Sequence, residues 1–225
     1  MKLLSVSRAR SIWVMRFEDL NRHGKSIIPL ISAVAQKYNF IEYTKLENLA
    51  HLQEQGMGLS FLKGTFINSA QIPVAVDLMV YNDAVFADTH SSTADSDAFL
   101  TDLLEWMTVQ FDLSPYAESI RSRLYLSELW VQSSKSLNTL NPRLVGFVDK
   151  LNSVIPAYYN RRPTFETTGI TIGCDRTSSN SMFGPFKFER AEISPFEENR
   201  YYSIASIPTD DHILLLDELE QILGG

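Results

Sequence analysis

Val74-Ala-Val-Asp-Leu-Met-Val-Tyr-Asn-Asp-Ala-Val-Phe-Ala-Asp-Thr89 is the stretch that decides the fold class of this chain. Two runs of strand-forming residues flank the pair Asn82-Asp83, and both residues of this pair tolerate the positive φ angles of a tight turn. The pattern predicts a β-hairpin, and if Asn82-Asp83 form a two-residue turn, Val80 faces Val85. Because a short hairpin joins antiparallel strands, we expect the sheet to be mostly antiparallel.

The same register places Asp77 opposite Asp88, with His90 on the same side. Directly opposed like charges destabilise an antiparallel pair unless something compensates for them. An arginine or lysine, a shared proton, or a divalent metal held by Asp77, Asp88 and His90 could do so. A metal at this place could activate water for hydrolysis. A loop longer by one residue, or solvated strand ends, would dissolve the cluster, and we favour that interpretation.

Outward from the hairpin, apolar periodicity predicts the remaining elements of the first half. They are a strand at 11–17, a helix at 26–37, a short helix at 46–55, a strand at 59–67 and a helix at 98–109. The second half predicts strands at 124–131, 165–172, 186–191 and 201–207, and a final helix after 208–211. It also predicts a helix that Asn141 caps and Pro142 opens. The apolar stripe of this helix consists of Leu144, Phe147, Val148 and Leu151.

Both halves therefore read strand, helix, three strands, helix. Asp97-Ala98-Phe99-Leu100 also aligns without gaps with Asp211-His212-Ile213-Leu214, at an offset of 114 residues. We predict an α+β fold with amphipathic helices packed on the sheet and an internal duplication, whose halves are residues 1–113 and 114–225. The alternative is two unrelated stretches of α+β structure.

Composition narrows the function classes. The chain has 225 residues, 44% of them hydrophobic, and a net charge of −7, which disfavours general binding to nucleic acid or an anionic membrane. Cys174 is the only cysteine in the sequence, which excludes an intrachain disulfide and a multi-cysteine zinc site. No stretch approaches the roughly 20 apolar residues of a membrane helix. We expect a cytoplasmic protein with no membrane contact.

Two short motifs resemble parts of a nucleotide-binding site, but the residues around them do not fit such a site. His23-Gly24-Lys25-Ser26 resembles the end of a phosphate-binding loop, but Asp19 stands where that loop requires its first glycine. Asp217 follows an apolar run as a magnesium-binding acid would, yet its neighbours continue at helical spacing. We therefore expect no nucleotide site around Lys25 and Asp217.

One acidic cluster precedes the closing helix of each half, and helix capping explains both clusters without a ligand. They are Asp95/Asp97 and Asp210/Asp211/His212. His212 is expected to be an exposed or packed histidine. Gly224-Gly225 fits an ordinary helix terminator, with a conjugation tag as the alternative.

Basic residues lie beside aromatic residues at two places. They are Tyr158-Tyr159-Asn160-Arg161-Arg162 and Arg200-Tyr201-Tyr202. This composition suits single-stranded nucleic acid and protein interfaces alike, and the negative net charge favours the interface. We expect a non-catalytic component without a cofactor, which binds another protein or its own copies. The alternative is a metal-dependent hydrolase that uses Asp77, Asp88 and His90.

Overall fold

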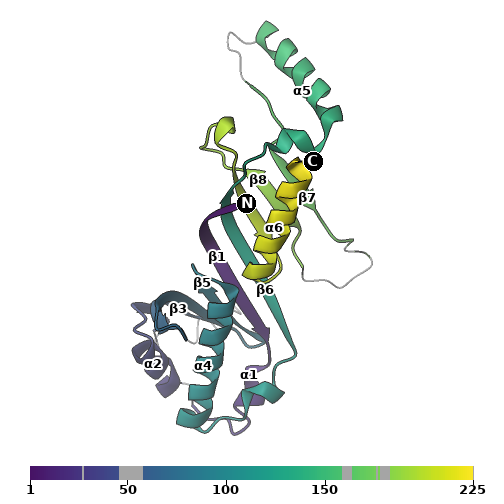
Figure 1. The fold of residues 1–225 in the computed structure, drawn as a ribbon. Coiled ribbons are helices and arrows are strands. Elements are labelled where there is room, and N and C mark those ends of the chain that lie inside the picture. The colour runs from purple at the N-terminus through teal and green to yellow at the C-terminus, as the bar shows by residue number, and fades with distance from the viewer. Residues whose placement is uncertain (27, 46–57, 159–163, 176, 178–182, 225) are drawn as a thin grey trace. The chain divides into compact units, whose positions relative to one another are not determined.

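The computed structural model describes residues 1–26, 28–45, 58–158, 164–175, 177 and 183–224 (Figure 1). Its strands are β1 Lys2–Val14, β2 Glu42–Tyr43, β3 Leu59–Ile67, β4 Pro73–Val80, β5 Ala84–Thr89, β6 Ser122–Gln132, β7 Gly169–Ile172, β8 Phe186–Arg190 and β9 Arg200–Ala205. Its α-helices within these residues are α1 Phe17–Leu20, α2 Ile28–Lys37, α4 Thr93–Phe111, α5 Pro142–Val154 and α6 Thr209–Gly224. Single 3₁₀ turns are η2 Tyr116–Glu118, η3 Leu137–Leu140, η4 Ile155–Ala157 and η5 Phe196–Glu198.

The strands form one antiparallel sheet in the order β2-β3-β4-β5-β1-β6-β9-β8-β7, which confirms the predicted α+β class. With the short elements set aside, the order strand, helix, three strands, helix occurs twice, as β1-α2-β3-β4-β5-α4 and β6-α5-β7-β8-β9-α6. A common origin of the two halves, and their division after residue 113, stay predictions. In the described ranges, no helix combines the length and the apolarity needed to span a bilayer.

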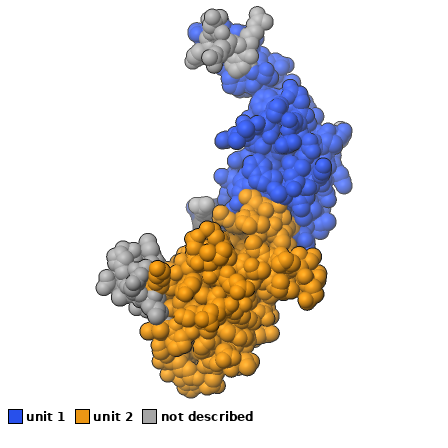
Figure 2. Space-filling view, turned by 90° about the vertical axis from the view of Figure 1, so that its left-hand side faces the viewer, with its two compact units in different colours: residues 1–5, 128–206, 210–225 blue, residues 6–127, 207–209 orange. Residues whose placement is uncertain are grey.

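The chain forms two compact units, coloured separately in Figure 2. Unit 1 consists of Met1–Ser5, Glu128–Ser206 and Asp210–Gly225, and unit 2 consists of Val6–Ser127 and Ile207–Thr209. β1 and β6 contribute residues to both units, so neither unit is one continuous segment of the chain. We describe each unit by itself.

Unit 2 contains the hairpin, and its register is the one that a two-residue turn produces, so the one-residue slip that formed part of the favoured interpretation is wrong. Val80 pairs with Val85, and Asp77 pairs with Asp88. The residues of β4 that alternate with Asp77 point into the core, where Val76 and Leu78 are buried among aromatic rings. A two-residue turn thus fixes which face of the hairpin is buried.

The predicted start of the helix at residue 98 is wrong, since α4 begins at Thr93. The hydroxyl of Ser92 accepts a hydrogen bond from the N–H of Asp95 at 3.1 Å and caps the helix. Asp97 therefore lies one turn inside α4 and is not a cap. Its carboxylate accepts hydrogen bonds from the Trp13 indole at 2.8 Å and from the Tyr125 hydroxyl at 2.9 Å.

Other boundaries also move. β1 begins at Lys2 rather than at residue 11, whereas β3 spans the predicted residues 59–67. In α6, Asp210 and Asp211 lie in the first turn, where negative charge interacts favourably with the positive end of the helix dipole. The predicted short helix at 46–55 lies outside the described residues, as does Gly225.

Candidate functional site

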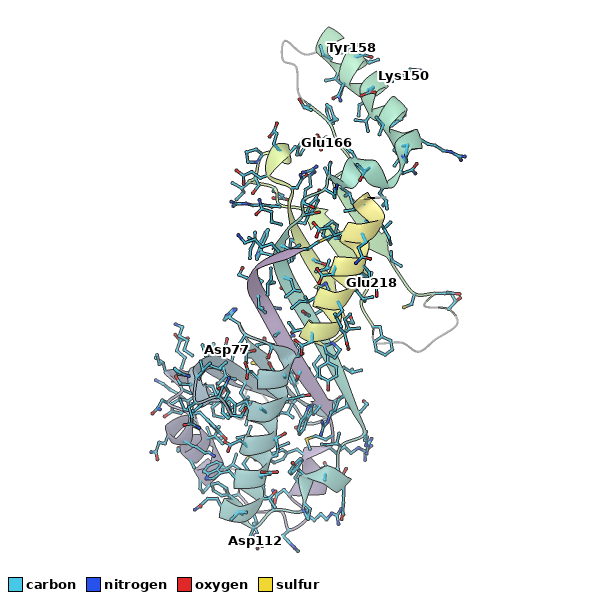
Figure 3. All side chains as sticks on the ribbon, viewed as in Figure 1. Asp77, Asp112, Lys150, Tyr158, Glu166 and Glu218 are labelled. Atoms are coloured by element: carbon cyan, nitrogen blue, oxygen red, sulfur yellow. The ribbon has the colours of Figure 1, made fainter. Side chains whose placement is uncertain are left out.

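The α5 helix of unit 1 exposes the apolar stripe that the sequence predicts for it. Leu144 is 43% exposed and Phe147 is 65% exposed, and no residue of this helix is buried. Val148 and Leu151, which complete the stripe, are only half-buried. Figure 3 shows Lys150 and Tyr158 on this segment. The expectation that amphipathic helices pack on the sheet therefore does not hold for α5.

Local sequence explains why these residues form a helix. The side chain of Asn141 accepts a hydrogen bond from the N–H of Arg143 at 3.1 Å, and Pro142 occupies the first turn. A proline there removes only an N–H that has no partner within the helix, so it costs little. The predicted cap and helix start are confirmed.

The first end of α5 is anchored through the 3₁₀ turn η3. Leu137 is fully buried, and its N–H donates to the Tyr201 hydroxyl at 3.0 Å. The Thr139 hydroxyl lies 2.7 Å from the carbonyl oxygen of Leu223, near the end of α6, and equally 2.7 Å from that of Ser136, and its single proton is shared between them. These contacts fix the chain directly before α5 against the core of unit 1.

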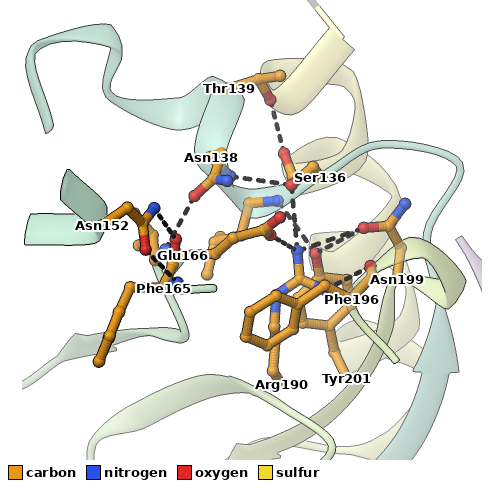
Figure 4. Close-up of polar contacts among 12 residues, drawn as sticks. Ser136, Asn138, Thr139, Asn152, Phe165, Glu166, Arg190, Phe196, Asn199 and Tyr201 are labelled. Carbon is orange, nitrogen blue, oxygen red and sulfur yellow. Dashed lines mark hydrogen bonds and ion pairs between the residues drawn. The ribbon is translucent and has the colours of Figure 1, made fainter. Parts of the chain in front are cut away.

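The far end of α5 is tied down by the segment that returns to the sheet. The side chain of Asn152 forms two hydrogen bonds with the backbone of Phe165, accepting at 2.7 Å and donating at 3.2 Å. Beside it, Glu166 accepts from the Arg190 guanidinium at 2.6 Å. Figure 4 shows these contacts together. Since both ends are held, α5 projects as an arm with a set direction.

Arg190 of β8 is the centre of this anchor. Its side chain is almost fully buried, and burying a guanidinium is costly unless it is well paired. It donates to Glu166, to the carbonyl of Phe196 at 2.8 Å and to the Ser136 hydroxyl at 3.1 Å. The Phe196 ring lies 4.8 Å from the guanidinium carbon, a cation–π distance. Arg190 is thus a structural support of the arm.

Of the two predicted basic-aromatic patches, the first lies outside the described residues except for Tyr158, and the second can be followed residue by residue. Tyr158 follows the arm and is 79% exposed, while Tyr159, Arg161 and Arg162 lie outside the described residues. Arg200 forms an ion pair with Glu198 at 2.9 Å. Tyr201 is fully buried and stacks on Phe188, with ring centroids 4.3 Å apart.

Tyr202, the last residue of the second patch, packs on Trp130 and donates its hydroxyl to Glu128. Neighbouring residues of a strand point to opposite faces of the sheet, and this separates Tyr201 from Tyr202. The Arg200-Tyr201-Tyr202 run is therefore not one exposed surface.

Asp77 and Asp88 lie opposite each other, and an arginine supplies the counter-charge. Arg10 on the neighbouring strand β1 pairs with Asp88 in register. Its Nε and one terminal nitrogen each donate to an Asp88 oxygen at 2.6 Å. Asp77 accepts from the N–H of Lys63 at 2.7 Å. The sequence named an arginine among the possible compensators, but the pairing of two strands so far apart in sequence is not a local pattern.

His90 does not turn toward the two carboxylates. Its Nδ1 lies 2.7 Å from the carbonyl oxygen of Ser7, so Nδ1 carries the proton and donates. Within the part of the chain that the structure describes, no group of three or more histidine, cysteine, aspartate or glutamate residues is arranged to hold a metal. This geometry does not favour the hydrolase hypothesis.

The residues that resembled a nucleotide site have structural contacts instead. The ammonium of Lys25 donates to the carbonyls of Phe111 and Asp112 and to the Asp112 carboxylate, at 2.7 to 3.1 Å. A cation in this position stabilises the negative end of the α4 dipole. Asp217 belongs to α6 and not to a strand.

Comparisons with known proteins give no family for this chain: no protein-family model matches it, and no curated protein matches it. The geometry of unit 1 therefore carries the functional argument. What it offers is an anchored helix with an apolar stripe and exposed charges at Arg143, Asp149 and Lys150. Such a surface suits binding.

Proposed function

We propose that this chain is a protein-interaction component whose contact element is the α5 arm. The observation that carries the proposal is the exposure of Leu144 and Phe147 on a helix that is held at both ends. Burying a leucine or phenylalanine side chain contributes about 1.5–3 kcal/mol of free energy, so covering this stripe would contribute substantially to the binding of a partner. Contiguous exposed apolar surface marks interaction sites.

Anchoring supports the proposal from a second side. A contact helix that must first be ordered loses conformational entropy on binding, and this loss weakens affinity. The contacts of Thr139 and Asn152 set the arm's direction beforehand. Action in the cytoplasm belongs to the same proposal, and the exposed thiol of Cys174, which is not part of a disulfide, supports it, because such thiols persist in reducing compartments.

Site-specific photo-crosslinking tests the proposed function. A photoreactive phenylalanine analogue replaces Phe147 in the full chain, and in a control it replaces Val109, an 84% exposed residue of α4. We expect a discrete protein adduct from position 147 that Leu144→Glu abolishes, and no such adduct from position 109. Equal crosslinking at both positions, or none at 147, would overturn the proposal.

A further inference from the structure

The helices α4 and α6 show the same burial at several positions when their sequences are aligned on their first residues, Thr93 and Thr209. The offset is then 116 residues, and not the 114 that the sequence comparison gave. Four matched pairs are buried in both helices. These pairs are Thr93 and Thr209, Ser96 and His212, Leu100 and Leu216, and Met107 and Leu223.

The two helices differ along one face. Phe99 is fully buried, but its counterpart Leu215 is 45% exposed. Trp106 is half-buried, but its counterpart Ile222 is 63% exposed. Between them, Asp102 of α4 corresponds to Glu218 of α6. Spacings of three, four and seven residues place these positions on one side of a helix.

In unit 2 the helix α2 covers this side of α4. The ring of Tyr38, directly after α2, meets Phe99 edge-on with centroids 4.8 Å apart. The ammonium of Lys37 donates to Asp102 at 2.8 Å and lies 5.1 Å from the centre of the Trp106 ring. An apolar contact and an ion pair thus join α2 to α4.

The α5 arm carries the same covering pattern as α2. Aligning Pro29 with Pro142 matches the α2 stripe, which is Ile31, Val34, Ala35 and Tyr38, with Leu144, Phe147, Val148 and Leu151. It also matches Lys37 with Lys150. All four stripe residues of α2 are buried, whereas the α5 stripe is exposed or half-buried. In unit 1, therefore, one face of α6 is exposed, and the apolar stripe of α5, which corresponds to the stripe of α2, is exposed or half-buried.

The anchors of α5 oppose its folding onto α6 of the same chain. Such folding would have to break the contacts of Asn152 with Phe165 or of Glu166 with Arg190. Charge also gives two paired α5 arms less complementarity than α5 has with α6, because each arm carries Arg143 and Lys150 against the single acid Asp149. The complementary surface is α6, which contains no lysine or arginine and exposes Glu218. Among the described residues, neither Lys150 nor Glu218 has an ion-pair partner.

We propose that two copies of this chain exchange their arms. The stripe of α5 in each copy covers Leu215 and Ile222 on α6 of the other copy, and Lys150 pairs with Glu218 of the second copy. The contact occurs twice around a twofold axis, so the assembly closes as a dimer. This inference rests on the proposed function, because it names the partner of the same arm.

Charge reversal across the contact tests the exchange by the dissociation constant in sedimentation equilibrium. We expect the wild-type chain to form a dimer that Phe147→Glu abolishes. Lys150→Glu and Glu218→Lys should each weaken the dimer about tenfold, since each places like charges together. Both side chains are exposed, so neither change is expected to disturb the fold, and circular dichroism checks this.

Mixing the two single variants gives the sharpest result. In an exchanged dimer, Lys150→Glu and Glu218→Lys copies combine into a heterodimer with two opposite-charge pairs, so mixing should restore wild-type affinity. An arm that folds onto its own chain gains nothing from mixing. Absence of restoration, a dimer insensitive to Phe147→Glu, or a monomer at every concentration would overturn the inference. A monomer whose position 147 still crosslinks to a different protein would leave the proposed function intact.

Discussion

Thr93 and Thr209 cap each other. The Thr209 hydroxyl accepts a hydrogen bond from the N–H of Thr93 at 3.0 Å, and the Thr93 hydroxyl accepts one from the N–H of Thr209 at 2.9 Å. Both residues are buried, and each is the first residue of a helix. The first N–H groups of a helix have no partner within it, so here each helix start supplies what the other lacks.

Removing either hydroxyl should leave a buried N–H without a partner. We expect Thr93→Val and Thr209→Val each to lower the free energy of unfolding by about 1–3 kcal/mol. Denaturant titration of the full chain measures this change. Thr101→Val is the matched control, because among the described residues the Thr101 hydroxyl bonds to the carbonyl of Asp97 within the same helix and to no other helix. Equal stability of Thr93→Val and wild type would contradict the mutual capping.

The Arg10–Asp88 pair predicts an asymmetry between the two opposed carboxylates. Asp88→Asn should lower the free energy of unfolding by about 1 kcal/mol, because Arg10 loses a two-point ionic contact that is partly screened by solvent. Asp77→Asn is the control, since the amide oxygen can still accept from the N–H of Lys63. A metal chelator should leave the melting temperature unchanged. A chelator-sensitive protein, or equal losses in both variants, would point back to a metal.

Local patterns in the sequence predicted the features that are set by neighbouring residues, such as turns and helix starts. The turn residues Asn82-Asp83 predicted the hairpin and Asn141 marked the start of α5. The register of the hairpin was left open, and the slip that we favoured does not occur. Arg10 could not be identified as the partner of Asp88, because strand pairing across 78 residues leaves no periodic signal. The start of α4 was missed because a polar run before an apolar stripe can hold several caps, and the structure uses Ser92.

The candidate site shows the limit of hydrophobic periodicity. Spacing reveals which side of a helix is apolar, but it does not reveal what covers that side. Val34 and Phe147 occupy equivalent places in their stripes, yet Val34 is buried and Phe147 is exposed. The arm was therefore predicted as a helix and missed as a contact element. The signal that could have found it is the similarity of the two apolar stripes, once they are aligned on Pro29 and Pro142.

Gly64 in β3 allows the closest approach of an aromatic ring. A β-carbon added here would lie 2.4 Å from the Phe40 ring, far inside van der Waals contact. Gly64→Ala should therefore lower the free energy of unfolding by about 1–3 kcal/mol. Gly146→Ala is the control, because a β-carbon there meets nothing within 4 Å and alanine favours the helix by about 0.5–1 kcal/mol. Thermal melts that rank the two variants the other way would refute this packing.

His212 is a fully buried histidine of α6 with one hydrogen-bond partner among the described residues. Ser203 donates its hydroxyl proton to the carbonyl of Lys187 at 2.9 Å, so it accepts from Nε2 of His212 at 2.8 Å. The Nδ1 atom has no partner in the described part of the chain. Burial lowers the pKa of His212 from 6.5 to about 4, because the charged ring would be poorly solvated.

This depressed pKa predicts acid sensitivity with a defined window. Between pH 6.5 and about pH 4 the unfolded chain binds a proton that the folded chain does not, so the free energy of unfolding falls as the pH falls. The contribution of His212 reaches about 3 kcal/mol at the lower end of this window. Denaturant titrations across the window should show that the free energy of unfolding falls more steeply with falling pH for wild type than for His212→Gln, because the variant lacks this proton uptake. A His212→Gln variant that kept the wild-type slope would refute the assignment.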